Sequence, residues 1–439
     1  MRELCNKSLS YSIALMLNTG LTHYPFLNTQ LGQNATVFFD RATFGKGGVS
    51  FRYSEVVNGD ISFSEVVFGE GEVSFSNAKF GNGQVNFSDA KFGNGRVDFT
   101  SAELGNRKVT FDKAEFGDRG VCFCDVDFCK TNTNTINGVV TFKEVTFGKG
   151  AVDFEHAKFG KGTVNFYKSS FGDGDVNFKD AKFGEGNVFF DSCEFKGNIS
   201  FRELQDVKKL SSFSLRNSIF NKSLDMPDNI FNCIPDLTNT KLTNQVSLDR
   251  MEISDNYPPK GNFDKSDGGR LCRLKELAEA NKNHQQALDF HVIEMRAKRY
   301  NTKLIKGKTP HMLLDILFDI ACLYGQSIIR PVLSLIVLTI VCACIYAYES
   351  SLDYFPFCYG LLYSLSQVFS FVPAGRSITI GILDKLFPCE TIIPDVVYFF
   401  SLLQGVLSSV LLFLILDVQV FSYNWAKKSK FFRLCFISD

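Results

Sequence analysis

The sequence contains few residues whose type and spacing could support chemistry, and the first candidates are three cysteines. Cys122 and Cys124 flank Phe123 and are expected to point outward, and Cys129 follows nearby. Thiolates bind soft metal ions, so a metal site is an alternative here that the sequence does not favour. His291 and Glu294 share one face of an expected helix, but without further ligands they favour a solvated surface. The sequence therefore predicts no metal site.

Motifs for catalysis and for nucleotide binding are absent from the sequence. It has no nucleophile elbow, no Walker loop and no paired carboxylates in a plausible pocket, and its five histidines do not cluster. Its recurrent Gly-x-Gly steps precede no helix and no Lys-Ser/Thr pair, so we interpret them as turns. The 47 basic and 47 acidic residues form no basic stripe for nucleic acid. We expect no catalytic residue, no cofactor and no nucleic-acid partner.

A tandem repeat positions most of the other residues. Phenylalanines recur every 12 residues, with a second set five residues after the first. Steps of five and seven keep no helical face apolar, and the glycines would break a helix, so the pattern indicates a β-solenoid. Stacked coils would bury the phenylalanines against their equivalents in the next coil. The clearest expected core residues are Phe63, Phe75, Phe87 and Phe99 of the first set, and Phe80 and Phe92 of the second.

These residues resemble the pentapeptide-repeat proteins. Ala90-Lys91-Phe92-Gly93-Asn94 and Val97-Asp98-Phe99-Thr100-Ser101 match the five-residue step of that family. The resemblance implies a right-handed quadrilateral β-helix, here with coils of about 24 residues because every second step is two residues longer. From Phe39 to Phe201 it implies about six to seven coils and a rod about 30 Å long. It says little about activity.

The solenoid is expected over residues 37–251, with a degenerate last coil after Phe201. Residues 1–36 are interpreted as an N-terminal cap, with a weak signal peptide as the alternative. The step from Phe128 to Phe142 is 14 residues instead of seven, so we expect a surface loop that leaves the stack intact. Residues 252–310 then change in composition and predict a helical hairpin linker, with helices at Arg270–Asn281 and His284–Tyr300.

A membrane domain is expected over residues 311–439. Two uncharged apolar stretches, 331–348 and 396–416, are long enough to span a bilayer, and 311–324 is expected to lie at the interface. Basic residues precede the first span and follow the second, whereas the connecting loop is acidic. The positive-inside rule therefore places both termini and the solenoid in the cytoplasm, on an inner or plasma membrane.

A third apolar stretch, 354–376, is short for a span and contains Pro356 and Gly360, so we interpret it as re-entrant. The order of span, re-entrant helix, loop and span resembles a two-helix potassium-type channel subunit. The expected pore-lining residues are Ser364, Gln367, Val372, Pro373, Ala374, Gly375 and Arg376, with Gln404, Gly405 and Ser408 as hinge or packing residues in the second span. The sequence carries Phe371-Val372-Pro373-Ala374-Gly375 where that family has its filter, so potassium selectivity does not follow.

The whole order of domains resembles bacterial membrane proteins that join pentapeptide repeats to a channel-like two-helix domain. Arg273–Ala278, Tyr324–Ser327 and Ser401–Gln404 carry that likeness. Two function classes stay open, of which the first is the predicted function and the second is the alternative. One is an oligomeric pore, expected as a tetramer, coupled to the solenoid as a sensor. The other is a membrane-tethered scaffold without conductance, whose solenoid binds an unidentified protein partner.

Polar residues in the membrane segments favour the pore, yet such residues also simply pack helices together. Cys358 and Cys389 both fall in the extracytoplasmic segment, where a disulfide between them is a hypothesis.

Overall fold

The computed structural model describes residues 23–25, 36–129, 138–243, 245–254, 257, 263–306, 310–350, 356–368, 373–387 and 394–435. Side chains are described in the same ranges except for 23–25, 302–306, 310–311, 373–378 and 417–435. The chain forms two compact units, Met1–Tyr300 and Asn301–Asp439. The expected cap residues before 36, apart from 23–25, and most of the expected surface loop lie outside the described residues.

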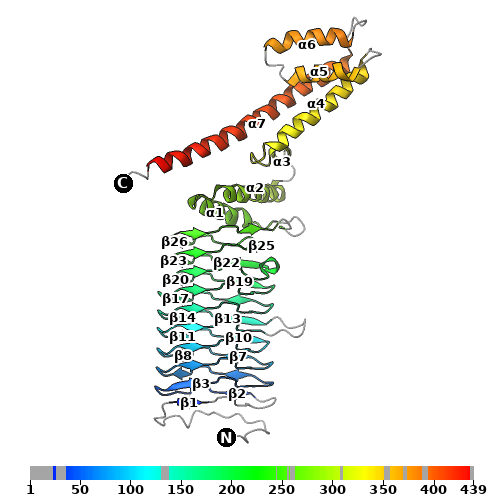
Figure 1. Ribbon diagram of the computed structural model, residues 1–439. Helices are drawn as coiled ribbons and strands as arrows, with labels where there is room; N and C mark the ends of the chain where they lie inside the picture. The colour runs from blue at the N-terminus through cyan, green and yellow to red at the C-terminus, as the bar shows by residue number, and fades with distance from the viewer. Residues whose placement is uncertain are drawn as a thin grey trace. The chain divides into compact units, whose positions relative to one another are not determined.

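The first unit contains a parallel β-solenoid of about nine turns, which confirms the expected fold class (Figure 1). Short strands from successive coils pair in parallel and form one ladder along each side of the stack. The first ladder contains β1 (His23–Pro25), β3 (Gly48–Ser50), β6 (Val73–Ser74), β9 (Val97–Asp98), β12 (Val121–Cys122), β15 (Val152–Asp153), β18 (Val176–Asn177), β21 (Ile199–Ser200), β24 (Leu224–Asp225) and β27 (Val246–Ser247).

The second ladder contains β2 (Val37–Phe38), β4 (Ile61–Ser62), β7 (Val85–Asn86), β10 (Lys108–Thr110), β13 (Val139–Thr141), β16 (Val164–Asn165), β19 (Asn187–Phe189) and β22 (Ser212–Ser214). The third contains β5 (Val67–Phe68), β8 (Lys91–Phe92), β11 (Glu115–Phe116), β14 (Thr146–Phe147), β17 (Ser170–Phe171), β20 (Glu194–Phe195), β23 (Ile219–Phe220) and β26 (Lys241–Leu242). Single bridges from Glu55 to Gln205, and then β25 (Ile230–Phe231) with β28 (Glu252–Ile253), mark the fourth side. A short 3₁₀ turn, η2 (Val207–Lys209), interrupts one late coil.

The coil length follows from residues that hydrogen-bond between neighbouring coils. The Ser64 amide donates to Asp40 Oδ1, 24 residues away, and the same offset recurs through the early coils. Across the insertion the offset becomes 31, as in the bond from the Lys143 amide to Asp112 Oδ1. The ladders on both sides of the insertion stay in register, so the seven additional residues leave the stack intact, as expected.

The interior of the solenoid is filled by two kinds of aromatic contact. Phe63 stacks on Phe87 of the next coil, with ring centroids 4.8 Å apart and planes 3° apart. Within the coil it meets Phe75 edge to face at 5.3 Å and 79°. Offset stacking and edge-to-face packing are the favoured aromatic geometries, so the repeat fills the core without unfavourable ring contacts. All six phenylalanines expected in the core are buried.

Each coil turns next to its first-set phenylalanine, in the same way every 12 residues. The residue two positions after it has a positive φ, as in Glu65 at 56° and Asp89 at 56°. The residue before it accepts a hydrogen bond from the residue after it, as when the Ser88 amide donates to Asn86 Oδ1 at 2.9 Å. Short polar side chains bond their own backbone well, and this explains their recurrence at these positions.

The hairpin, which was expected as a linker, packs against the last coil. Helices α1 (Asp267–Ala280) and α2 (His284–Lys306) share the hydrophobic core of the solenoid through Leu271, Leu274 and Phe290 (Figure 1). Gln286 Nε2 donates to the carbonyls of Leu248 at 2.6 Å and Met251 at 2.7 Å. An exposed strand edge is a template for aggregation, so we interpret the hairpin as the C-terminal cap.

The second unit consists of α3 (Pro310–Cys322), α4 (Ile329–Glu349), α5 (Pro356–Val368), α6 (Pro373–Leu386) and α7 (Asp395–Cys435). Within the described residues, two helical segments are long and apolar enough to cross a membrane, Ile329–Glu349 and Asp395–Leu416. The segment expected to be re-entrant contains the short helix α5 and the start of α6. Helix α7 continues beyond its apolar part to Cys435, so most of the expected basic tail is helical.

A glycine-to-alanine change at a corner should disrupt the stack. A Cβ at Gly95 would lie 1.8 Å from the carbonyl oxygen of Gly71 in the preceding coil, where only backbone could yield. We expect Gly95→Ala to destabilise the solenoid by about 2 to 3 kcal/mol. Thermal unfolding of the solubilised full chain, followed by circular dichroism, measures the effect.

Gly269→Ala is the matched control because no atom lies within 4 Å of its Cβ position in α1. We expect it to leave stability unchanged or to raise it by up to about 1 kcal/mol. Equal effects of the two substitutions would contradict the close approach of the coils.

The contact of Gln286 with the last coil predicts that substitutions of Gln286 and of its neighbour Gln285 differ in their effect on stability. Gln286→Ala removes a donor from two buried carbonyls, of which that of Leu248 also accepts from the Met251 amide at 2.9 Å, and we expect a loss of about 1 to 3 kcal/mol. Gln285→Ala removes only an exposed contact with Asp289 and should change stability by less than about 0.5 kcal/mol. Limited proteolysis, followed by identification of the first cleavage sites, should show early cutting in the last coils of Gln286→Ala only. Equal protection in both variants would remove Gln286 from the cap.

Candidate functional site

The candidate site lies where α4, α5 and α7 pack together in the second unit (Figure 1). Gly360 makes the close approach of α4 and α5 feasible, because a Cβ there would lie 2.6 Å from the carbonyl oxygen of Ala343. Small residues at helix contacts are typical of membrane helices, whose association depends on close packing and hydrogen bonds. The short α5 is therefore held against both candidate spans.

A chain of buried hydrogen bonds joins the three helices. The Tyr346 hydroxyl of α4 donates to Gln404 Oε1 of α7 at 2.9 Å. Gln404 Nε2 donates to the Ser364 carbonyl of α5 at 2.9 Å and approaches its hydroxyl to 2.8 Å. The Ser364 hydroxyl itself donates to the Thr339 carbonyl of α4 at 2.7 Å. Each polar side chain of this Gln404 network thus finds its partner within one chain.

Aromatic and hydroxyl contacts extend the same contact region. Tyr346 and Tyr363 meet edge to face at 4.8 Å and 81°. The Tyr363 hydroxyl lies 3.0 Å from Ser401 Oγ, and Ser401 also donates to the Val397 carbonyl one turn earlier in α7. These residues form a packed contact between α5 and α7.

The expected site residues divide into three groups. Ser364 and Gln404 are buried and bonded to each other, and Gln367 is also buried. Ser408 is buried too, and its hydroxyl has no hydrogen-bond partner among the described residues, while Gly405 lies beside the network in α7. Pro373, Ala374, Gly375 and Arg376 form the first turn of α6, but their side chains and all of Val372 lie outside the described residues. Their role in a pore stays a prediction.

The outer surface of the second unit is strongly apolar. Leu402 of α7 is 73% exposed and Leu333 of α4 is 55% exposed. Helix α3, expected at the interface, exposes Leu314 at 64% and Ile320 at 66%, whereas its Asp319 is buried. A helix with its apolar face outward and its acidic side chain inward suits contact with lipid.

The solvated surface expected for Glu294 is wrong. Its side chain is 1% exposed, and it accepts hydrogen bonds from Lys275 Nζ at 2.8 Å and Lys298 Nζ at 2.5 Å. Burial alone would raise the pKa of this carboxyl, but the two lysines outweigh it and hold the pKa below its ordinary value. The Glu294 carboxylate on α2 thus forms an ion pair with Lys275 on α1. No cluster of three metal-ligating side chains occurs in the described part of the chain.

Thr339 and Tyr346 were missed as site residues. They lie seven residues apart on α4 and therefore on one helical face, a signal that the sequence contained. In an apolar span, however, an isolated threonine or tyrosine is unremarkable, and its partner becomes apparent only when the helices are packed.

Replacing Gln404 should loosen the three helices. Gln404→Leu removes its bonds to Tyr346 and Ser364, and we expect the second unit to lose about 1 to 2 kcal/mol of stability. Unfolding in bicelles by increasing fractions of SDS measures the change. Ser409→Ala is the control because the exposed Ser409 hydroxyl bonds only within its own helix. Equal stability of both variants would mean that the Gln404 network contributes nothing.

A comparison with protein-family models found no match for this chain, and a comparison with curated protein sequences found none either. The fold and the packed helices are therefore the grounds on which a function is proposed.

Proposed function

We propose that this protein is a membrane-tethered interaction scaffold. In this proposal the two apolar helices anchor the chain, and the solenoid, of the pentapeptide-repeat type, presents its sides to a protein partner. One observation carries the choice between the two open function classes. Ser364 and Gln404, polar residues that favoured a pore in the sequence, bond to each other and to Tyr346 and Thr339 inside one chain. They therefore need no water-filled pore to satisfy them.

The surface of the solenoid supports the same proposal. Its outward positions carry charges of both signs that pair between coils, as in Lys91 with Glu115 at 3.4 Å and Lys161 with Glu185 at 3.4 Å. Exposed pairs of this kind contribute little to stability, so these side chains are free to meet a partner. Regular extended faces are the surfaces that repeat proteins use for binding.

The placement of charge suggests which side of the membrane the solenoid occupies. The basic residues before the first span are Arg296, Lys298, Arg299, Lys303, Lys306 and Lys308, and those after the second are Lys427, Lys428, Lys430 and Arg433. By the positive-inside rule both termini and the solenoid are cytoplasmic. The partner is then a cytoplasmic protein that becomes concentrated at the membrane.

An oligomeric pore is the second candidate, and the position of α5 favours it. A helix of 13 residues is about 20 Å long, too short to cross a bilayer, yet α5 is packed between two helices that are long enough. Two spans enclose no pore alone, so this function requires several copies of the chain, for which a tetramer is the simplest arrangement.

Ion flux from liposomes that contain the full chain separates the two functions. The scaffold predicts no flux above that of protein-free liposomes, and resistance of the protein to carbonate extraction from membranes. The matched variants are Arg376→Glu and a deletion of 354–376. Flux that the deletion abolishes and that Arg376→Glu alters in size or rectification would establish the pore instead.

Photo-crosslinking in living cells tests the scaffold directly. The cross-linking residue replaces an exposed side chain on one of two sides of the solenoid, Glu55 or Lys79 on the fourth and Lys91 or Glu115 on the third. We expect a discrete product from one side and none from the other, because a partner covers one face. The absence of a product at all four positions would contradict a partner on these two sides of the solenoid.

A further inference from the structure

The solenoid brings together the two side chains that flank each first-set phenylalanine. In one coil Ser74 and Ser76 have their hydroxyls 3.3 Å apart, and in the next Asp98 Oδ1 accepts from Thr100 Oγ1 at 2.6 Å. Near the end of the stack, where Leu237 takes the place of the phenylalanine, Asp236 and Thr238 repeat this contact at 2.6 Å. The convergence therefore recurs at turns that carry different short polar residues.

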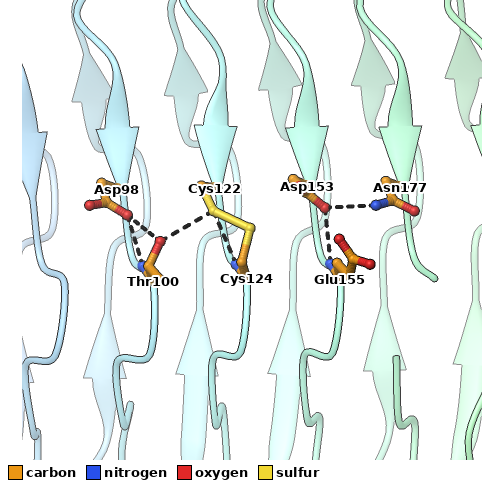
Figure 2. Close-up of a disulfide and its surroundings, with 7 residues drawn as sticks. All are labelled: Asp98, Thr100, Cys122, Cys124, Asp153, Glu155 and Asn177. Atoms are coloured by element: carbon orange, nitrogen blue, oxygen red, sulfur yellow. Dashed lines mark hydrogen bonds between the residues drawn. A yellow bond between two sulfur atoms is a disulfide. The ribbon is translucent and has the colours of Figure 1, made fainter. Parts of the chain in front are cut away.

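Cysteines occupy these two positions in one described coil only. Cys122 pairs with Asp98 and Asp153 in the ladder, so it is the counterpart of Ser74 two coils earlier, and Cys124 is the counterpart of Ser76. The Cα atoms of Cys122 and Cys124 are 5.4 Å apart and their sulfurs are bonded (Figure 2). This separation lies within the range that disulfides occupy.

The surroundings of the pair allow it to be reduced without a change of fold. Cys122 Sγ lies 3.3 Å from the Cys124 amide, which donates to it as the Thr100 amide donates to Asp98 in the neighbouring coil (Figure 2). Thr100 Oγ1 also lies 3.3 Å from the same sulfur. A free thiol at Cys122 would keep the amide as its partner, so the turn persists in both redox states.

The pair also differs from the other cysteines of the solenoid. Burial raises the pKa of Cys129 to about 12, with Asp127 adding to the effect, and it raises the pKa of Cys233 to about 12. Cys193 is buried, and burial likewise raises its pKa. Thiolates are the reactive species, so these three are inert. Cys124 is partly exposed, whereas Cys122 is 9% exposed.

We propose that Cys122 and Cys124 form a reversible dithiol–disulfide site that exchanges with a low-molecular-weight disulfide. The partly exposed Cys124 thiolate attacks one sulfur of the small disulfide, and one small thiolate leaves. The Cys122 thiolate then attacks Cys124 Sγ, the bond between Cys124 and the small molecule breaks, and a second small thiolate leaves. The two protein thiol protons end on the two small thiols, and two electrons pass from the protein to the oxidant. This site does not depend on the scaffold or the pore.

The test uses reduced, solubilised full-length protein incubated in glutathione buffers of graded ratios of oxidised to reduced form. Acid quenching, alkylation of free thiols and mass spectrometry of the tryptic peptide 120–130 then count the free sulfurs. Fragmentation of the peptide separates Cys129 from the pair, and Cys129→Ala provides an independent check. We expect the loss of both labels at Cys122 and Cys124 as oxidised glutathione rises, a peptide lighter by two hydrogens than the dithiol form, and full recovery of both labels with dithiothreitol.

Single serine variants test the roles of the two sulfurs, and Ser74-Phe75-Ser76 shows that serine fits both positions. In Cys122→Ser we expect glutathione to accumulate on Cys124, because no resolving thiol remains. In Cys124→Ser the buried Cys122 should react at least severalfold more slowly. Labels retained at every ratio, or a bond that dithiothreitol does not reduce in the folded protein, would overturn the site. Equal reactivity of the two single variants would overturn the order of attack.

Discussion

The pairing of backbone between successive coils is the constraint on which the solenoid depends. Coils that hydrogen-bond to their neighbours lie about 4.8 Å apart. Every position of one coil therefore lies directly over its equivalent in the next, and the side chains form columns. Phenylalanine fills the inner columns because its rings stack at about this spacing, as Phe63 and Phe87 do at 4.8 Å. Glycine fills corner columns such as Gly71 and Gly95, where no Cβ has room. The 12-residue repeat of the sequence results from these columns.

Such a stack must end, and a similar requirement arises where the apolar helices of the second unit pack together. The last coil leaves carbonyls without a following strand, and Gln286 satisfies two of them from α2. Among the apolar helices, Gln404 likewise places its amide between two partners on α4 and α5. In both places a single buried glutamine replaces the water that packing excludes, because an unmade hydrogen bond costs more than a made one contributes.

The sequence predicted whatever repeats and little of what occurs once. The spacing of the phenylalanines was enough to predict the fold class and the insertion that the stack tolerates, because equivalent positions of successive coils lie in the same environment. Long apolar runs were enough for the two candidate spans. The hairpin was interpreted only as a linker because the sequence of an amphipathic helix shows which face is apolar but not which surface that face packs against. Glu294 was expected in solvent because the sequence shows one of its lysine partners, Lys298 on the same helix, but not the packing that brings Lys275 from another helix. The partners of Ser364 could not be predicted because they also lie on other helices.

Function in a repeat protein is therefore best sought where the repeat is broken. The residue types at inward positions are determined by packing. At an outward position whose residue varies from coil to coil, the fold requires no particular side chain. A cysteine at one such position could be chance. A cysteine at each of the two positions of one turn is different, because the same turn brings these two side chains into contact elsewhere in the stack. The fold supplies the proximity, and Cys122 and Cys124 supply two sulfurs between which a bond can form and break reversibly.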